Sequence, residues 1–296
     1  MKFRLIDEEK SHHTISRMCR VLGVTAAGYH AWRSRPLSPR TLEDQRLKER
    51  ITMHFQASRG TYGPPRILDD LADEGIFVSR KRIARLMREL GLAGVSGREG
   101  KRRRRKSTLA ESDAVADLVR RDFTADEPNQ VWFADITYVP TWEGWLFLAV
   151  VMDACTKRIV GWSMRDDLKA DIVVDALGMG TTMRRPDAGL VHHSDRGAQY
   201  RSLVFGKSLR DSGILASMGE TGVPHDNAVT ESVMATIKKE CVHRHRFKTR
   251  DEARFEIFGY IEGFYNPHRR HSSLGNLSPA EFERRLEQRQ LQAAAS

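Results

Sequence analysis

Three acidic residues occupy positions where folded proteins commonly place functional side chains rather than core side chains. Asp135 interrupts an otherwise apolar stretch over residues 131–139, Asp195 follows a short apolar segment, and Glu231 stands near the start of a long helical pattern. Strand ends and helix starts meet at one edge of a sheet, where sites of this kind form. Three carboxylates gathered there repel one another unless a cation lies between them. The pattern therefore predicts a metal site.

The donor type indicates which metal and which reaction. Carboxylate oxygens suit Mg²⁺ or Mn²⁺. Two such ions about 4 Å apart can activate a water or hydroxyl group and stabilise the leaving oxygen of a phosphodiester. Asp135, Asp195 and Glu231 are therefore the candidate catalytic residues, and the same three are the candidate ligands of two Mg²⁺ or Mn²⁺ ions.

Other groups near these acids have simpler interpretations. Asp153 falls where a turn should follow the second strand, and Asp commonly starts turns. His192 and His193 could orient Asp195 or contact DNA, or could simply be hydrogen-bonded at a strand end; His193 is kept as a supporting residue. The segment 241–245 holds one Cys and two His without the second ligand pair that zinc sites need.

The elements that must position the acids follow from hydrophobic patterning. Apolar, β-branched and aromatic runs predict five strands, at residues 131–139 (closed by Pro140), 145–152, 158–164, 189–192 and 214–217. Helical periodicity predicts helices at residues 112–121, 170–183, 203–212 and 227–241. Three strands in succession, followed by alternating helices and strands, predict a mixed sheet covered by helices.

Net charge separates the chain into two parts. The whole chain carries +10, but residues 1–106 hold 25 basic and 12 acidic side chains, a balance of +13. The remaining residues hold 24 and 27, a balance of −3. A basic part joined to a slightly acidic part is typical of a polyanion-binding module attached to a different domain, although a basic part can also be a well-solvated surface.

The basic part is predicted to be helical. Residues 15–22 have one apolar helix face, Gly23 can end that helix, and Thr25 can cap the next, which gives a helix-turn-helix pattern. A further helix is expected over residues 41–55 and a short one over 67–73. Ser79 caps another helix, whose polar face fits phosphate contact. That face carries Arg80, Lys81, Arg82, Arg85 and Arg88.

A linker is predicted after this helix. Residues 91–110 contain four glycines and the run Lys101, Arg102, Arg103, Arg104, Arg105 and Lys106. Adjacent positive charges repel one another and seldom belong to a packed element. Such a run can bind DNA through release of counterions, and we expect that role here because basic helices precede it.

Composition excludes several classes of protein. No apolar stretch is long enough for a membrane helix, and the charged N-terminus does not resemble a secretory signal. Cys19, Cys155 and Cys241 lie far apart, which argues against a disulfide framework. We expect a cytoplasmic protein without membrane contact.

The chain resembles a known family in both spacing and local sequence. Asp195 and Glu231 are separated by 35 residues, as in the D, D-35-E signature of retroviral integrases and many bacterial transposases, and Lys238 follows at the basic position of that signature. Further motifs resemble the second-reading-frame product of the insertion-sequence-three transposase family. They are Gly60-Thr61-Tyr62-Gly63, Pro128-Asn129-Gln130-Val131-Trp132, Asp135-Ile136-Thr137-Tyr138, His193-Ser194-Asp195-Arg196-Gly197, Asp226-Asn227-Ala228, Lys238-Lys239-Glu240 and Tyr265-Asn266 with Arg269-Arg270-His271-Ser272.

This resemblance implies an RNase H-like α/β core, a five-stranded mixed sheet flanked by helices, with an all-α helix-turn-helix region before it. It implies metal binding by the three acids, contact of Lys238 with the DNA end, and a supporting role for Asn227. Arg269 and Arg270 are expected to contact DNA. We expect domains at residues 1–55 (helix-turn-helix-like), 56–108 (basic helices and linker) and 126–286 (catalytic core), with a tail at 287–296.

The function implied is that of a bacterial, nucleoid-associated DNA transposase. It would bind the terminal inverted repeats of an insertion sequence, cut strands and join them to target DNA. The competing hypotheses are a catalytically silent DNA-binding regulator of transposition and a metal nuclease without strand transfer. Two element ends must be brought together, so the expected partners are double-stranded DNA and a homo-oligomer, at least a dimer. The resemblance adds the upstream-frame product as a further partner.

Overall fold

The structure is a computed structural model that describes residues 1–95, 118–119, 125–219 and 228–294. The chain forms two compact units, residues 1–52 and residues 53–296. In the described ranges, no helix is both long enough and apolar enough to cross a membrane. The helix predicted over residues 112–121 and the Arg-rich run at 101–106 fall mainly or wholly outside the described residues.

The first unit packs three short helices around a small core. Ile6, Cys19 and Tyr29 are buried at its centre. Gly23 adopts a left-handed conformation (φ 63°) where the second helix ends. The Thr25 hydroxyl accepts a hydrogen bond from Gly28 N at 3.0 Å, which caps the third helix. These contacts confirm the predicted helical pattern, with helices α1 (Lys2–Glu9), α2 (Ile15–Leu22) and α3 (Ala26–Ser34).

Three further helices follow. The Ser79 hydroxyl accepts from Arg82 N at 3.3 Å and caps the last of them, as predicted. Its apolar side chains, Ile83, Leu86 and Met87, are buried. The charged residues therefore lie on the opposite side of that helix. The helices are α4 (Pro39–Ala57), which contributes to both units, α5 (Pro64–Asp73) and α6 (Arg80–Glu89).

A five-stranded mixed sheet forms the centre of the second unit. Its strand order is β3-β2-β1-β4-β5. The pairs β1–β2 and β2–β3 are antiparallel, whereas β1–β4 and β4–β5 are parallel. The predicted mixed sheet is thereby confirmed. The strands are β1 (Val131–Thr141), β2 (Gly144–Asp153), β3 (Ile159–Arg165), β4 (Val191–Ser194) and β5 (Leu215–Met218).

One predicted boundary is wrong. Pro140 was expected to close the first strand, but it lies inside β1 and pairs with Trp145. Proline lacks a backbone N–H and is tolerated where a strand has one free edge. This condition holds at Pro140 because β4 pairs with β1 only along Val131 to Phe133. β1 can therefore continue to the tight hairpin at Gly144.

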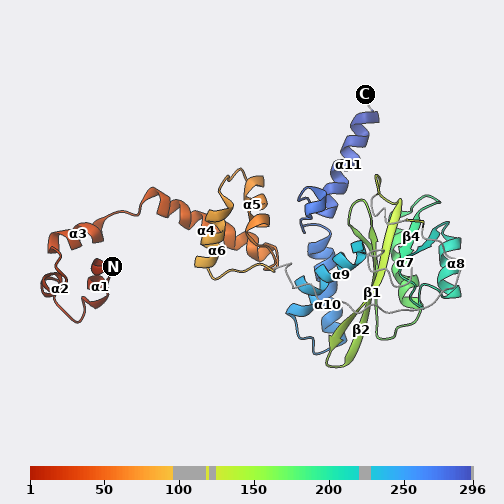
Figure 1. Cartoon of the computed structure of the whole chain (residues 1–296), viewed down its shortest axis with the longest axis horizontal. Coiled ribbons are helices and arrows are strands. Elements are labelled where there is room, and N and C mark those ends of the chain that lie inside the picture. Colours follow the sequence, from red (N-terminus) through yellow and green to blue (C-terminus); the bar gives the residue numbers. More distant parts are fainter. Residues whose placement is uncertain (96–117, 120–124, 220–227, 295–296) are drawn as a thin grey trace. The chain divides into compact units, whose positions relative to one another are not determined.

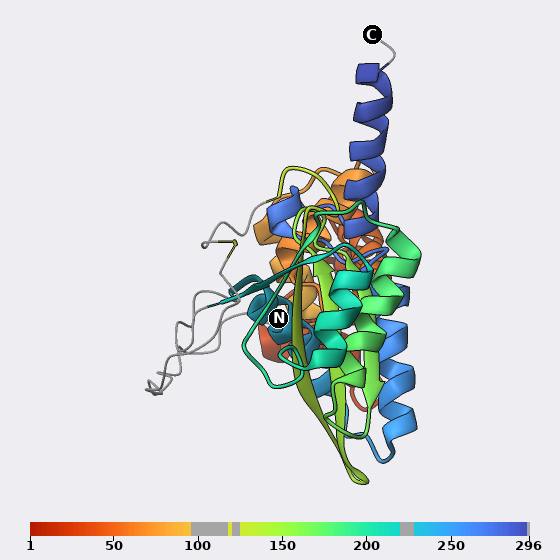
Figure 2. The same cartoon turned by 90° about the vertical axis from the view of Figure 1, so that its right-hand side faces the viewer.

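Helices cover both faces of the sheet (Figure 1). On one face lie α7 (Asp171–Arg184) and α8 (Leu203–Asp211), side by side in Figure 2. Their apolar side chains pack with Trp132, Ala134 and Val151 in the main core. The other side of β1 contacts α9 (Ala228–Glu240) and α10 (Arg250–Tyr260).

Close backbone packing holds α7 against β3. A Cβ atom added to Gly161 would lie 2.1 Å from the carbonyl oxygen of Ala176 and 2.9 Å from the nitrogen of Gly180. Glycine at position 161 therefore allows the helix and the strand to approach each other directly. This contact anchors the helical layer opposite α9.

The C-terminal part is also helical. A π-helical turn (Ile261–Tyr265) continues α10, and short 3₁₀ turns occur at Val242–Arg244 and Ser272–Leu274. The Ser278 hydroxyl accepts from Glu281 N at 3.2 Å and caps α11 (Pro279–Ala294). The segment expected to be a tail from residue 287 is helical as far as Ala294.

Candidate active site

Strand β1 presents Asp135 on the side that faces α9. Side chains alternate along a strand, and Trp132 and Ala134 belong to the core shared with α7. Phe133 and Asp135 must therefore point to the opposite face. Asp135 is partly buried there, and its Oδ1 accepts a hydrogen bond from Ile136 N at 2.8 Å.

The parallel pairing of β1 with β4 brings Asp195 alongside. Phe133 pairs with His193 in this register, and their rings meet edge to face at 5.6 Å. Asp135 and Asp195 each follow this last pair by two residues, so the register brings both to the same end of the paired strands. Asp195 is exposed, just beyond the last residue of β4.

A tight loop fixes the Asp195 carboxylate. Its Oδ1 accepts a hydrogen bond from Gly197 N at 2.9 Å. A Cβ atom added to Gly197 would lie 2.9 Å from the same oxygen, so a side chain there would displace the Asp195 carboxylate. The contact from Gly197 N thus holds one carboxylate oxygen of Asp195.

Helix α9 supplies the third acid and a cation. Glu231 lies in its first turn and is exposed, and Lys238 lies in its last turns. Seven residues correspond to nearly two helical turns, so Glu231 and Lys238 share one face of α9. The helix contacts β1, the strand that carries Asp135.

The electrostatics of Asp135 show that these groups act on one another. Burial raises the pKa of Asp135 from 3.8 to about 6. The hydrogen bond from Ile136 N and the positive charge of Lys238 lower this pKa. The negative charges of Asp195 and Glu231 raise it, and the contribution of Glu231 is the smallest of these. Asp135, Asp195, Glu231 and Lys238 therefore form one electrostatic cluster, which we call the carboxylate cluster.

His193 has a position suited to support. It is buried, and its Nδ1 lies 2.9 Å from the Ser217 hydroxyl on the neighbouring strand β5. This contact fixes the ring two residues before Asp195. His192 points to the other face, where burial lowers its pKa to about 4 and its ring packs against Phe205 at 5.2 Å. Asn227, the second supporting residue predicted, lies outside the described residues.

Asp153 has a structural environment. Its side chain is fully buried, and Oδ1 accepts hydrogen bonds from the backbone N (2.9 Å) and the hydroxyl (3.1 Å) of Thr156. Oδ2 accepts from Asn129 N at 2.7 Å. These contacts agree with its interpretation as a turn residue rather than a metal ligand.

The residues predicted to contact DNA lie in several parts of the chain. On α6, Arg80, Lys81 and Arg88 are exposed, whereas Arg82 and Arg85 are partly buried, with Arg85 paired to Glu89 at 2.6 Å. Arg80, Lys81 and Arg88 thus lie at the surface of a capped helix, as phosphate contact would require. Arg102, Arg103, Arg104 and Arg105 lie outside the described residues.

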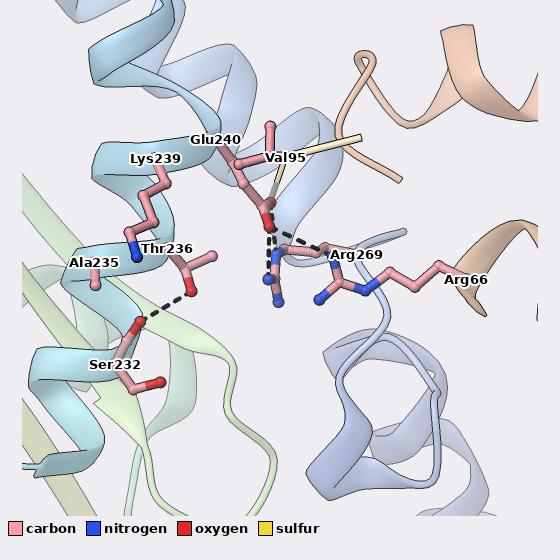
Figure 3. A pocket seen from close by; sticks show the side chains of 8 residues that line it. All are labelled: Arg66, Val95, Ser232, Ala235, Thr236, Lys239, Glu240 and Arg269. Carbon is pink, nitrogen blue, oxygen red and sulfur yellow. Dashed lines mark hydrogen bonds and ion pairs between the residues drawn. The ribbon is translucent and has the colours of Figure 1, made fainter. Parts of the chain in front are cut away.

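Arg269 has contacts that its sequence position did not reveal. It is 6% exposed, and its Nε and Nη2 donate to the two carboxylate oxygens of Glu240, each at 2.7 Å. The hydroxyl of Tyr260 also donates to Glu240, at 2.8 Å. A guanidinium group held in this way (Figure 3) has a structural role. The arrangement therefore does not support the predicted DNA contact of Arg269.

Arg270 is also engaged within the protein. Its Nε lies 2.6 Å from Asp70, its Nη2 pairs with Asp73, and its backbone N donates to the Tyr62 hydroxyl at 2.7 Å. Asp70 and Arg270 are 200 residues apart, and no local sequence signal could have paired them. These contacts likewise favour a structural role over the predicted DNA contact.

Comparison with known proteins identifies the family. An integrase core domain matches residues 125–224 and again 212–279, and an HTH-like domain matches residues 42–105. The chain is 37% identical over 286 residues to "Transposase InsF for insertion sequence IS3A" of Escherichia coli (strain K12), which covers 96% of this chain and 98% of that protein. The chain belongs to the IS3 family of transposases.

The chain is also similar to other known proteins. The chain is 42% identical over 273 residues to the "Insertion element IS600 uncharacterized 31 kDa protein" of Shigella sonnei, covering 92% of this chain and 99% of that protein. Among solved structures, the HTLV-2 integrase catalytic core domain in complex with magnesium (trimeric form) aligns with 52% of this chain and 96% of that chain. That alignment has 13% sequence identity and a TM-score of 0.41.

Family membership relates the carboxylate cluster to a reaction on DNA. A transposase with an integrase core cleaves and joins DNA, and its HTH-like domain binds DNA. The cluster offers only hard oxygen donors, and the raised pKa of Asp135 means that its charge is costly without a cation. Among the described residues, no three Asp, Glu, His or Cys side chains are close enough to hold an ion. Carboxylate oxygens are donors of the type that Mg²⁺ and Mn²⁺ prefer.

Proposed function

We propose that this IS3-family transposase binds the ends of an insertion sequence and catalyses metal-dependent cleavage and strand transfer. Asp135, Asp195 and Glu231 are the proposed metal ligands and catalytic residues. The observation that carries the proposal is the placement of the acids: β1, which bears Asp135, pairs in parallel with β4, which Asp195 follows, and contacts α9, which bears Glu231. Carboxylates brought to one edge of a sheet are suited to hold a cation.

The proposed chemistry is in-line attack on phosphodiesters. Two Mg²⁺ or Mn²⁺ ions, when bound, would activate the attacking oxygen and stabilise the leaving oxygen. Asp135, on a rigid central strand, would set the position of the site, and the loop contact from Gly197 N would orient Asp195. Cleavage with water leaves a free 3′ hydroxyl, and that hydroxyl then attacks a second strand. One phosphodiester replaces another, so strand transfer needs no external energy source.

Lys238 is proposed to hold the DNA backbone beside the reacting phosphate. It lies on the same face of α9 as Glu231 and acts electrostatically on Asp135. The exposed cations of α6 would bind the DNA outside the reacting strand by phosphate contact, which positions but does not specify sequence. Joining two ends requires at least a dimer in the DNA complex, and the upstream-frame product is a proposed further partner.

Single substitutions test the assignment. Asp135→Asn, Asp195→Asn and Glu231→Gln should each lower strand joining on element-end DNA with Mg²⁺ by at least about 100-fold, because even groups that only support a metal ligand cost 10- to 100-fold when lost. Asp211→Asn, an exposed acid at the end of α8, is the matched control and should retain activity. Full activity in any one of the three variants would overturn the assignment.

The same assay separates the competing functions. A catalytically silent regulator would bind element ends equally well with and without Mg²⁺ and after Glu231→Gln, and would yield no cleaved product. A nuclease would give cleaved but never joined strands. A joined product that depends on Mg²⁺ and on all three acids supports the transposase reaction over both.

A further inference from the structure

The hairpin that joins β1 and β2 carries three exposed aromatic side chains. Trp142 is 74% exposed, Trp145 is 54% exposed and Tyr138 is 49% exposed. Figure 2 shows this hairpin projecting beyond α7 and α8 at the bottom of the view. Large aromatic side chains are mostly buried in proteins, and a group of them at the surface marks an interaction site. We call Tyr138, Trp142 and Trp145 the aromatic tip.

Neighbouring groups hold the aromatic tip in place. Tyr138 meets Trp145 edge to face, with 5.9 Å between the ring centroids. Trp142 N donates a hydrogen bond to the Phe247 carbonyl oxygen at 3.1 Å. On the other strand, Arg250 Nε donates to the Trp145 carbonyl oxygen at 3.1 Å. The backbone on both sides of the hairpin is therefore fixed, so a ligand would meet rings that need little reorganisation.

The segment that fixes the aromatic tip is basic. Residues 243–250 contain four Lys or Arg and two His, and no acid. Lys248 Nζ lies 5.9 Å from the centroid of the Trp142 ring, and Arg246 is exposed beside it in the chain. In the parts of the chain that the structure describes, neither Arg246 nor Lys248 has a carboxylate partner. Both cations are thus available at the surface next to an aromatic ring.

The nearby acids do not cancel this charge. Glu143 and Glu252 each accept a hydrogen bond from a backbone N of the basic segment, at 2.9 Å and 2.7 Å. Asp251 pairs with Arg254 at 2.8 Å. The four Lys and Arg of residues 243–250 therefore outnumber Glu143 and Glu252, and the surface around the aromatic tip is positive.

Exposed aromatic rings beside cations are typical of surfaces that bind unpaired nucleic-acid strands. Bases stack on the rings, and the cations contact the phosphates. A second copy of this chain would also cover apolar rings. Lys is depleted at protein–protein interfaces, however, whereas Lys248 lies over the Trp142 ring. The chemistry of this surface therefore favours a nucleic-acid strand over a protein.

The length of β1 relates the aromatic tip to the carboxylate cluster. Trp142 follows Asp135 by seven residues, which is about 23 Å along an extended strand. Successive phosphates of one DNA strand rise about 3.4 Å along the axis. A strand that has one phosphate at the carboxylate cluster and follows β1 would reach the aromatic tip about seven nucleotides away.

We propose that the aromatic tip, together with Arg246 and Lys248, binds a single-stranded stretch of DNA. A base stacks on Trp142, and the two cations contact the adjoining phosphates. The inference rests on the proposed reaction on DNA and adds a contact away from the carboxylate cluster. It gives the β1–β2 hairpin a function in holding unpaired DNA while the acids act on a phosphodiester.

Binding of single-stranded DNA to the full-length chain tests the stacking. The probe is a labelled oligothymidylate of about 12 nucleotides, a length within the range of known single-strand sites, and a chelator prevents cleavage. Trp142→Ala should lower the affinity about 10-fold, which is within the range for loss of one base–aromatic stack. Trp142→Phe keeps a ring and should stay within about 3-fold of the wild type.

Tryptophan emission makes the measurement specific to this site. Stacking of a base should quench the emission of Trp142, so the emission of the wild type should fall on binding. A smaller fall is expected for Trp142→Phe at saturating DNA, because the stacking tryptophan is gone while binding persists. Equal quenching in the wild type and Trp142→Phe would overturn the proposal, even if the basic N-terminal part also binds the strand.

Salt dependence tests the two cations separately. Arg246→Gln with Lys248→Gln should reduce the slope of log K against log [salt] by about 1.4, at about 0.7 for each phosphate contact on a single strand. Trp142→Ala removes no charge and should keep the wild-type slope. Lys207 and Arg210 are exposed on α8, and Lys207→Gln with Arg210→Gln is the charge-matched control. Equal slopes for the two double variants would refute the phosphate contacts.

A matched aromatic control separates stacking from a general loss of surface. Phe255 on α10 is 75% exposed, close to the value for Trp142, but lies outside the aromatic tip. Phe255→Ala should bind the oligothymidylate with wild-type affinity. Equal affinities of Trp142→Ala and Phe255→Ala would overturn the proposal. Equal losses in Trp142→Ala and Trp142→Phe would also overturn it, because an aromatic ring would then not be what binds.

Two further results would assign the surface differently. An equal loss for Trp142→Ala on a fully paired duplex would refute base stacking, since paired bases do not offer their faces. A changed sedimentation of Trp142→Ala without DNA, with unchanged affinity for the oligothymidylate, would show a contact with a second copy and refute the DNA contact. Failure of the proposed catalytic function would appear instead as strand joining that survives loss of Asp135, Asp195 or Glu231, which binding in chelator does not involve.

Discussion

The carboxylate cluster should make the metal-free protein less stable than it could be, and Asp135→Asn should reveal this. Burial, with help from the charges of Asp195 and Glu231, raises the pKa of Asp135 from 3.8 to about 6. An acid with a raised pKa in the folded state favours folding in its protonated form. That contribution is complete below about pH 3.8 and is lost as the pH rises through about 6.

The magnitude follows from the size of the shift. A shift of about 2 units at about 1.4 kcal/mol per unit gives an upper limit of about 3 kcal/mol. Asparagine stays neutral at every pH, and its side-chain oxygen can still accept the hydrogen bond from Ile136 N. Asp135→Asn should therefore raise the free energy of unfolding by about 1 to 3 kcal/mol near pH 8 and by almost nothing near pH 4.

Urea unfolding in chelator, followed by tryptophan fluorescence, measures this difference, because Trp132 is fully buried on the same strand. Asp211→Asn should change the free energy of unfolding by less than about 0.5 kcal/mol at both pH values. Added Mg²⁺ should stabilise the wild type more than Asp135→Asn, since a bound cation offsets the same repulsion. Equal stability of wild type and Asp135→Asn near pH 8 would refute the reasoning.

Three other substitutions probe the scaffold. Glu240→Gln should lower the free energy of unfolding by about 3 to 5 kcal/mol, because Arg269 is left as a buried charge without a carboxylate. Replacing both Glu240 and Arg269 by apolar residues should restore much of that free energy. Gly161→Ala should cost at least about 2 kcal/mol, or prevent folding, because the new methyl group would overlap the Ala176 carbonyl. Ser79→Ala should cost about 1 kcal/mol through loss of the cap of α6, with thermal unfolding as the measurement for all three.

Local patterning was enough to predict most elements and their order. The strand that carries Asp135 and the helix that carries Glu231 were expected within a few residues of β1 and α9, because both have strong apolar periodicity. Caps such as Ser79 and Ser278 were also predictable, since a cap depends on residues three positions apart. The type and spacing of the three acids were sufficient to suggest a phosphodiester reaction.

Some boundaries depended on the neighbours of a strand. Proline ends most strands, but β1 continues through Pro140 because β4 does not pair with that part of β1. No partner strand there requires a hydrogen bond from the N–H that proline lacks. The strand predicted to end at His192 extends to Ser194, because pairing with β5 continues through Met218. Such pairings are not encoded in the local segment.

The sequence by itself determined the helix caps and the strand alternation, which depend on residues close to one another in the chain. It also determined the basic charge of the first part and the presence of the three acids. What only the tertiary structure decided was which charges meet. Arg269 and Arg270 looked like DNA contacts in sequence, yet they pair with Glu240 and Asp70, which lie 29 and 200 residues away. The energy of an ion pair depends on the distance between its two groups and on their burial. Neither quantity can be read from the number of residues that separate the groups in the sequence.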